Sequence, residues 1–142
     1  PFINLKSNAM KVLRGTVFGG IFYFLLGWLV YGIIFMDYFT AHINQCANNA
    51  DGSMIWWAII ASNLAAALLL TLILGWSNTV TVTGGLIKGA IFGGLVTAFI
   101  DLSFWSMTNM YDSLVTVAAE TILSAVVFAL VGMVIVLTRG KK

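Results

Sequence analysis

The chain has 142 residues, of which 61% are hydrophobic and only 8% are charged, and its mean hydropathy is +1.01. A water-soluble domain of this size cannot cover so much apolar surface with so few charged side chains, so we expect an integral membrane protein. The formal net charge of +2 comes without a clustered basic face, which excludes nucleic acid as a partner.

The sequence Ser7-Asn8-Ala9-Met10 is typical of a purification-tag remnant followed by a start methionine. We therefore expect residues 1–9 to be a tag remnant or tail and residues 10–142 to form one transmembrane domain. A genuine short N-terminal tail is the alternative. No cleavable signal peptide is expected, because the apolar segment after Met10 is too long for one.

Four long apolar segments predict helices at about residues 16–38, 54–76, 84–107 and 114–138. Each is long enough to cross about 30 Å of hydrocarbon, which takes roughly 20 residues. The segments are continuous, unlike the short alternating strands of a membrane β-barrel. Because the connections are short, neighbouring helices should be antiparallel, and we expect an all-α, up-down four-helix bundle.

The lysine and arginine residues gather at the two termini and near the second connection, and the first and third connections carry none. By the positive-inside rule, both termini face the cytoplasm. The polar segment 39–53 and the connection 108–113 then face outward.

Residues 14–21 (RGTVFGGI) and residues 88–95 (KGAIFGGL) share one pattern, and each stretch opens a long apolar segment. We interpret them as the starts of the first and third helices, and therefore as two copies of one helical hairpin with the same orientation. A chance likeness between glycine-rich membrane helices is the alternative.

Glycines also recur at a spacing of four, which places them on one helix face and lets a second backbone approach closely. They are Gly15 and Gly19 in the first helix and Gly85, Gly89 and Gly93 in the third. Such faces serve tight packing inside the bundle or between subunits, or a sliding surface.

Two acids, Asp101 and Glu120, lie inside apolar segments, each six residues from the predicted outer end of its helix. At about 1.5 Å per residue, both lie about 9 Å below the outer boundary and could meet. No intramembrane lysine or arginine can neutralise them, and two adjacent acids in a low dielectric should share a proton or bind a cation.

We therefore predict an outward-facing polar pocket for a proton, a cation or a cationic ligand. Its other expected members, at a similar depth, are Asn63, Ser62, Tyr31 and Trp28. The purely structural alternative is that the acids reach interfacial water or bond to nearby hydroxyl groups, namely those of Thr97, Ser103, Thr116 and Ser124.

The outer loop contains a weak set of metal ligands, Asp37, His42 and Cys46. One histidine and one cysteine make a poor ligand set, so we expect a solvated loop without a metal. The single cysteine excludes an internal disulfide, and no cofactor-binding motif is present.

Aromatic residues near the segment ends match the belts found at membrane interfaces. They are Trp56, Trp57, Trp76, Trp105 and Tyr111. Five further aromatic residues within positions 22–31 are denser than a belt requires, and they either fill the core or line a cavity for a hydrophobic molecule.

The segment Gly27-Trp28-Leu29-Val30-Tyr31-Gly32 is followed by a polar outward loop and a glycine-rich third span. In these features the chain resembles a family of small bacterial membrane proteins, catalogued as domain of unknown function 1761. The resemblance covers nearly all of residues 10–138. It implies a four-span protein of the bacterial inner (plasma) membrane, and it supplies no functional residue to carry over.

These features favour a small membrane protein that binds or transports a ligand or ion. Four short helices enclose little volume, so we expect a homo-oligomer, most simply a dimer, with the bilayer and a small ligand or cation as further partners. Two other functions stay open. One is an accessory protein that binds a partner through its small-residue faces; the other is a membrane enzyme that uses Asp101, Glu120 and His42.

Overall fold

The computed structural model describes residues 2–49 and 52–140. In chain order its elements are α1 (Phe2–Leu29), η1 (Val30–Ile34), α2 (Met36–His42), η2 (Gln45–Ala47), α3 (Trp56–Trp76), α4 (Val82–Met107) and α5 (Leu114–Thr138). Of these, η1 is a π-helical turn and η2 is a 3-10 turn. The described residues contain no strand, which confirms the all-α fold class.

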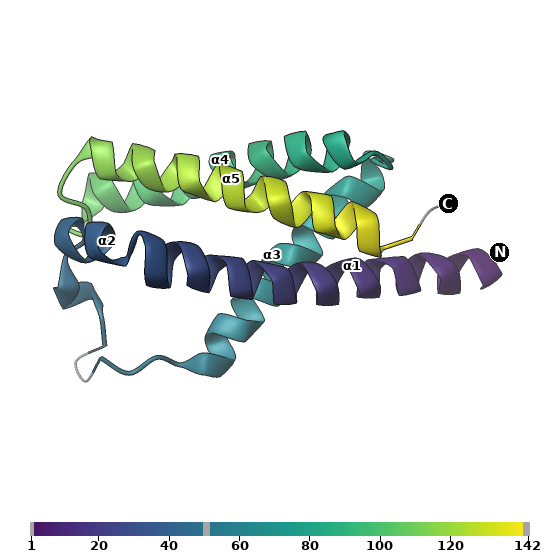
Figure 1. Cartoon of the computed structure of the whole chain (residues 1–142), viewed down its shortest axis with the longest axis horizontal. Coiled ribbons are helices and arrows are strands. Elements are labelled where there is room, and N and C mark those ends of the chain that lie inside the picture. The colour runs from purple at the N-terminus through teal and green to yellow at the C-terminus, as the bar shows by residue number, and fades with distance from the viewer. Residues whose placement is uncertain (1, 50–51, 141–142) are drawn as a thin grey trace.

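Four helices are long and apolar enough to span a membrane, namely Lys6–Ile34, α3, α4 and α5. They run alternately in opposite directions, so that both ends of the chain lie at one end of the bundle and α2 lies at the other (Figure 1). We call the end with the chain termini the inner end and the opposite one the outer end. The up-down order agrees with the prediction.

The predicted boundaries of α3, α4 and α5 are correct to within two residues, whereas those of the first helix are wrong. This helix begins at Phe2 instead of near residue 16, because the mixed apolar and polar residues at positions 2–15 extend the same helix. Near the outer end its regular hydrogen bonding changes at η1, and the short helix α2 follows at the outer end of the bundle (Figure 1).

The closest helix contact lies between α4 and α5, at the glycines of α4. A Cβ atom added to Gly89 would lie 2.1 Å from the carbonyl oxygen of Phe128, and one added to Gly85 would lie 2.6 Å from that of Gly132. The two backbones therefore touch, and only glycine fits between them. Gly93 faces the same residue of α5, Phe128.

The glycines of α1 also face other helices of the same chain. A Cβ atom on Gly15 would lie 2.8 Å from the side chain of Thr71 on α3, and one on Gly19 would lie 2.6 Å from Ile135 on α5. Both predicted glycine faces are thus used for packing inside the bundle.

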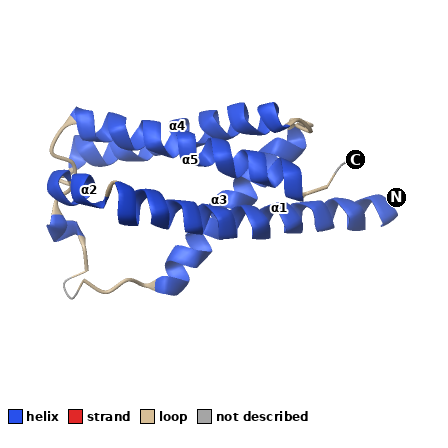
Figure 2. Cartoon of the chain, viewed as in Figure 1, coloured by secondary structure: helices blue, strands red, loops and turns tan. Residues whose placement is uncertain are grey.

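The best-packed apolar cluster lies toward the inner end. It contains Leu70 and Leu74 from α3 and Val131 and Ile135 from α5, all of them fully buried. From this contact α3 runs obliquely, and its first turns stand away from α2 and α5 (Figure 2). The outer halves of α1 and α3 therefore diverge.

The first and third connections are joined at the outer end. Ile43 and Tyr111 form an isolated antiparallel bridge, and the amide of Asp112 donates a hydrogen bond to the carbonyl of His42 at 3.2 Å. This contact, which we call the outer clamp, fixes the direction of the Tyr111 side chain.

Candidate functional site

The structure brings the two intramembrane acids together near the outer end of the bundle. Asp101 on α4 is 4% exposed, and Glu120 on α5 is half-buried. The two carboxyl groups are close enough to interact electrostatically with each other. They come from adjacent antiparallel helices and lie at equal distances from the α4–α5 connection, which is why they share a depth.

Tyr111 supplies the hydrogen bond to this pair. Its hydroxyl group donates to Asp101 Oδ1 at 2.9 Å, and its side chain is buried. Burial, the nearby carboxyl of Glu120 and the hydrogen bond to Asp101 raise the pKa of the Tyr111 hydroxyl, so it remains a proton donor. The assignment of Tyr111 to an interfacial belt is wrong, because the outer clamp turns the ring inward.

One oxygen of each acid lacks a partner. Asp101 Oδ2 and Glu120 Oε2 are buried and accept no hydrogen bond from any residue that the structure describes. A buried acceptor without a donor costs roughly 1–3 kcal/mol. The hydroxyl groups expected as structural partners bond to other atoms instead; they belong to Thr97, Ser103, Thr116 and Ser124.

Two tyrosines of the first helix complete the surroundings of the acids. Tyr23 and Tyr31 both lie within electrostatic range of Glu120. The Tyr23 ring packs on Phe128, with ring centroids 4.5 Å apart, and the Tyr31 ring packs on Phe39 at 5.4 Å. We define the carboxyl cluster as Asp101, Glu120, Tyr23, Tyr31 and Tyr111.

The same two tyrosines line a pocket between the first helix and the outer half of α3. Its volume is about 360 Å³, which lies within the usual range for small-molecule sites. We call it the aromatic pocket, and its lining residues are Tyr23, Phe24, Gly27, Trp28, Tyr31, Gly32, Met54, Trp56, Ile59 and Asn63. The carboxyl cluster and the aromatic pocket are therefore adjacent.

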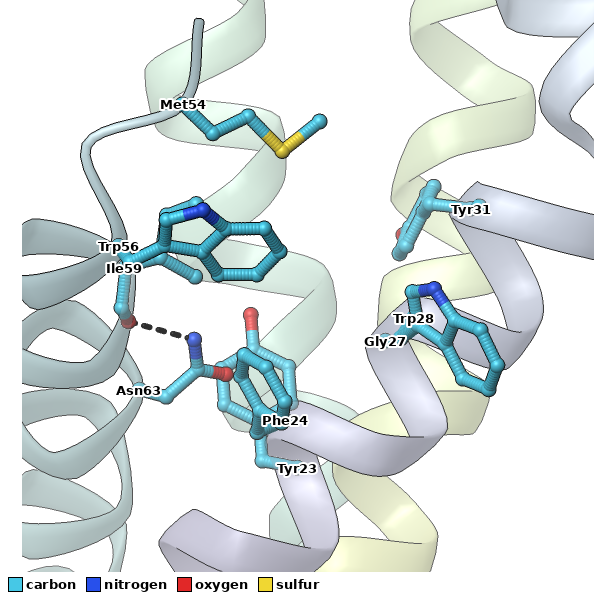
Figure 3. A pocket seen from close by; sticks show the side chains of 10 residues that line it. Tyr23, Phe24, Gly27, Trp28, Tyr31, Met54, Trp56, Ile59 and Asn63 are labelled. Carbon is cyan, nitrogen blue, oxygen red and sulfur yellow. Dashed lines mark hydrogen bonds between the residues drawn. The ribbon is translucent and has the colours of Figure 1, made fainter.

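Figure 3 shows how the two walls of the aromatic pocket face each other. Trp56 and Asn63 project from α3 toward Tyr23 and Phe24 on α1. The Asn63 amide donates to the carbonyl of Ile59 at 2.7 Å, which leaves its side-chain oxygen directed into the pocket. The pocket thus combines aromatic faces with one polar acceptor.

The π-helical turn η1 forms part of this wall. The amide of Phe35 donates to the carbonyl of Val30 at 2.9 Å, five residues back, instead of four. Such turns widen a helix locally and are frequent at functional sites. Tyr31 and Gly32, both within η1, line the pocket.

Of the four further predicted site residues, the structure places Asn63, Tyr31 and Trp28 on the aromatic pocket. Trp28 lies at the rim, and its indole points away from Asn63 (Figure 3). Ser62 does not line the pocket: it is exposed, and its hydroxyl donates to the carbonyl of Ile59 at 2.8 Å. Ser62 and Asn63 lie at nearly the same depth, but adjacent residues of a helix point about 100° apart. Depth alone therefore could not predict which of the two faces the pocket.

The weak metal ligands are not brought together. His42 Nδ1 lies 2.7 Å from the carbonyl oxygen of Tyr38, its ring stacks on that tyrosine, and its Nε2 lies 4.0 Å from Asp112 Oδ2. Cys46 is a free, exposed cysteine. Within residues 2–49 and 52–140, no three side chains of the His, Cys, Asp and Glu types form a group that could hold a metal.

Asp112 is an outer acid to which no pattern in the sequence pointed. It accepts hydrogen bonds from the hydroxyls of Thr116 at 2.6 Å and Ser113 at 3.0 Å. The bond from Thr116, followed by that from Ser113 and the proximity of His42, lowers the pKa of Asp112 below its ordinary value of 3.8. Only the backbone amide of Asp112 belongs to the outer clamp, so replacing its carboxylate provides a control for experiments on the carboxyl cluster.

Comparison of the chain with family models, with curated proteins and with solved structures finds no match. No related protein therefore indicates what the site binds, and the proposal below rests on the geometry of the site.

Proposed function

We propose that this protein is a membrane protein that binds hydrophobic monovalent cations in the aromatic pocket, against the carboxyl cluster. The observation that carries the proposal is the pair of buried oxygens, Asp101 Oδ2 and Glu120 Oε2, which have no partner among the described residues. Buried carboxyl groups without partners are stabilised by a proton or by a cation.

The part of the chain that the structure describes offers this pair no cation. The lysine and arginine residues of the described chain are at positions 6, 11, 14, 88 and 139, toward the inner ends of their helices. A positive charge at the carboxyl cluster therefore has to come from solution or from the membrane. When the site is empty, one proton shared by the two acids relieves their repulsion.

The aromatic pocket favours an organic cation over a bare metal ion. Tyr23, Phe24 and Trp56 offer ring faces, and a desolvated cation over such a face gains about 2 kcal/mol. A hard metal ion would instead need six or more oxygen ligands, and the pocket wall is mostly apolar. The bound cation displaces the shared proton, so the charge of the site is conserved.

A titration of the purified chain in detergent tests the proposal. The probe is tetraphenylphosphonium, and the control is tetraphenylborate, which has the same shape and the opposite charge. The fluorescence of Trp56 and Trp28, which line the pocket, reports binding. We expect saturable binding of the cation alone, and weakening by at least about tenfold, or about 1.4 kcal/mol, in Glu120→Gln and in Asp101→Asn.

The matched control is Asp112→Asn, which removes an outer carboxylate that is not in the carboxyl cluster. We expect its affinity for tetraphenylphosphonium to stay within about twofold of the wild type. Equal binding of the two probe ions, or unchanged affinity in both cluster variants, would overturn the proposal.

Transport would require a second exit from the pocket. The backbone contact of Gly85 and Gly89 with α5 closes the inner half of the α4–α5 pair. We therefore propose that a transport path runs between two copies of the chain in a homodimer, and the mass of the protein in detergent micelles tests this assembly.

The two alternative functions have less support. An accessory protein acting through its glycine faces would need them turned outward, whereas Gly15, Gly19 and Gly89 pack against helices of the same chain. An enzyme with His42 as a general base would need this residue beside the acids, whereas it contacts Tyr38 and Asp112 in the outer clamp.

A further inference from the structure

A second pocket lies at the inner end of the bundle, where α1, α3 and the end of α5 meet. Its volume is about 420 Å³, and its polar wall contains Lys11, Asn78 and Arg139. The apolar part of the wall is formed by Val12, Leu72 and Trp76. Asn8 also lines this inner pocket, but it belongs to the predicted tag remnant, so we do not count it among the ligands.

Arg139 is held in place by the turn between α3 and α4. Its guanidinium group donates to the carbonyl oxygen of Thr79, a buried residue of this turn. Lys88 donates to the hydroxyl of the same threonine at 2.7 Å, which fixes the turn from the α4 side. A guanidinium has five N–H donors in a rigid plane, so one bond to a carbonyl leaves the group able to bind a second acceptor.

No acidic residue is among the described residues that line the inner pocket. The acidic residues with described positions are at 37, 101, 112 and 120, and all of them lie toward the outer end of the bundle. Among the residues with described positions, no lysine or arginine forms an ion pair with a carboxylate. Burial also lowers the pKa of Arg139, which indicates that its charge is partly removed from water.

We propose that the inner pocket binds the phosphate group of an anionic membrane lipid, with Lys11 and Arg139 as its charged ligands. Two cations, one on α1 and one just after the end of α5, match the several acceptor oxygens of a phosphate. The apolar wall beside them matches the glycerol and first acyl carbons of a lipid, which a free phosphate ion lacks.

The position of the pocket in the bundle agrees with this ligand. Trp76, on the pocket wall, is 74% exposed at the inner end of α3, and tryptophan at such a place lies at headgroup level. Basic pockets between helices on the cytoplasmic side of a membrane suit anionic headgroups. The proposal depends on the membrane location of the chain and not on cation binding at the outer end.

Native mass spectrometry of the full chain tests the lipid site. The protein is mixed with equal amounts of dioleoyl phosphatidylglycerol and dioleoyl phosphatidylcholine, which differ in headgroup charge and share their acyl chains. We expect the wild type to retain the anionic lipid about fivefold or more over the zwitterionic one, and Lys11→Gln and Arg139→Gln each to lose this preference. Arg14→Gln, which removes an inner cation outside the pocket, should keep it.

Lys11→Gln is the decisive variant, because Arg139→Gln also removes the hydrogen bond to Thr79. Circular dichroism confirms that each variant is folded before lipid binding is compared. Equal preference in the wild type and Lys11→Gln, or equal loss in Arg14→Gln, would overturn the site. In a further arm, displacement of phosphatidylglycerol by millimolar inorganic phosphate would show a free-phosphate site and overturn the lipid assignment.

Discussion

Tyr111 is the single side chain on which the arrangement of the carboxyl cluster depends most. Its hydroxyl makes the only hydrogen bond to the Asp101 side chain found among the described residues, and it lies close to Glu120 as well. Its backbone is paired with Ile43 across the outer clamp. One tyrosine therefore joins the loop at the outer end to the buried acids.

Replacing Tyr111 with phenylalanine should lower the free energy of unfolding by roughly 1–3 kcal/mol, because Asp101 Oδ1 then loses its buried donor. Denaturant unfolding in mixed micelles measures this change. In a double-mutant cycle with Asp101→Asn, we expect a coupling energy of at least about 0.5 kcal/mol between the two sites. Additive effects of the two substitutions would show that the hydrogen bond contributes nothing to stability.

Single residues also show where prediction from the sequence succeeds and where it cannot. The shared depth of Asp101 and Glu120 follows from the constant rise of an α-helix, so counting residues was sufficient to pair them. The direction of Ser62 depends on how α3 is rotated, and the inward turn of Tyr111 depends on a contact between two loops. Neither the rotation of a helix about its axis nor a contact between loops leaves a local pattern in the sequence.

Among the helices, the α4–α5 pair is the most constrained, because its backbones touch at glycine. Gly89→Ala should lower the free energy of unfolding by about 1–3 kcal/mol. The added Cβ atom would lie 2.1 Å from the carbonyl oxygen of Phe128, and relieving this clash requires the backbone of one helix to move. Thermal unfolding in detergent measures the change.

Gly94→Ala on the same helix is the matched control. Its Cβ atom would lie 3.5 Å from that of Ala125, an ordinary contact, and alanine favours a helix over glycine by about 1 kcal/mol. We expect this variant to be as stable as the wild type or more so. Equal effects of the two substitutions would mean that α4 and α5 are not in backbone contact at Gly89.

The starts of α4 and α5 were predictable because each has a hydroxyl residue as its N-cap. The side chains of Thr81 and Ser113 accept hydrogen bonds from the amides of Gly84 and Thr116. By contrast, no local pattern in the sequence indicated η1 or the oblique course of α3. Both features contribute to the wall of the aromatic pocket. The sequence indicated that aromatic residues are dense in this region, but not that they line a pocket.

At the scale of the whole molecule, charge is divided between the two ends of the bundle. The described lysine and arginine residues lie toward the end with the chain termini, and the described acids lie toward the end with α2. This charge division matches the positive-inside rule, so we propose that both termini face the cytoplasm. The duplication of a hairpin stays an interpretation, and both hairpins do run in the same direction (Figure 1).

Cys46 provides a natural reporter of this orientation, because it is the single cysteine of the chain and it is exposed in the outer loop. A membrane-impermeant maleimide should label it in intact spheroplasts. The control is Val80→Cys in a Cys46→Ser background, which places an exposed cysteine in the α3–α4 connection and should react only after lysis. The reverse labelling pattern would show that the termini face outward.

The most direct test of cation binding is a difference infrared spectrum of the wild type on addition of tetraphenylphosphonium. If the cation occupies the aromatic pocket and displaces the proton shared by Asp101 and Glu120, the stretching band of the protonated carboxyl group disappears as the cation binds. Tetraphenylborate should leave this band unchanged. Saturable binding of tetraphenylphosphonium with an unchanged carboxyl band would contradict the account.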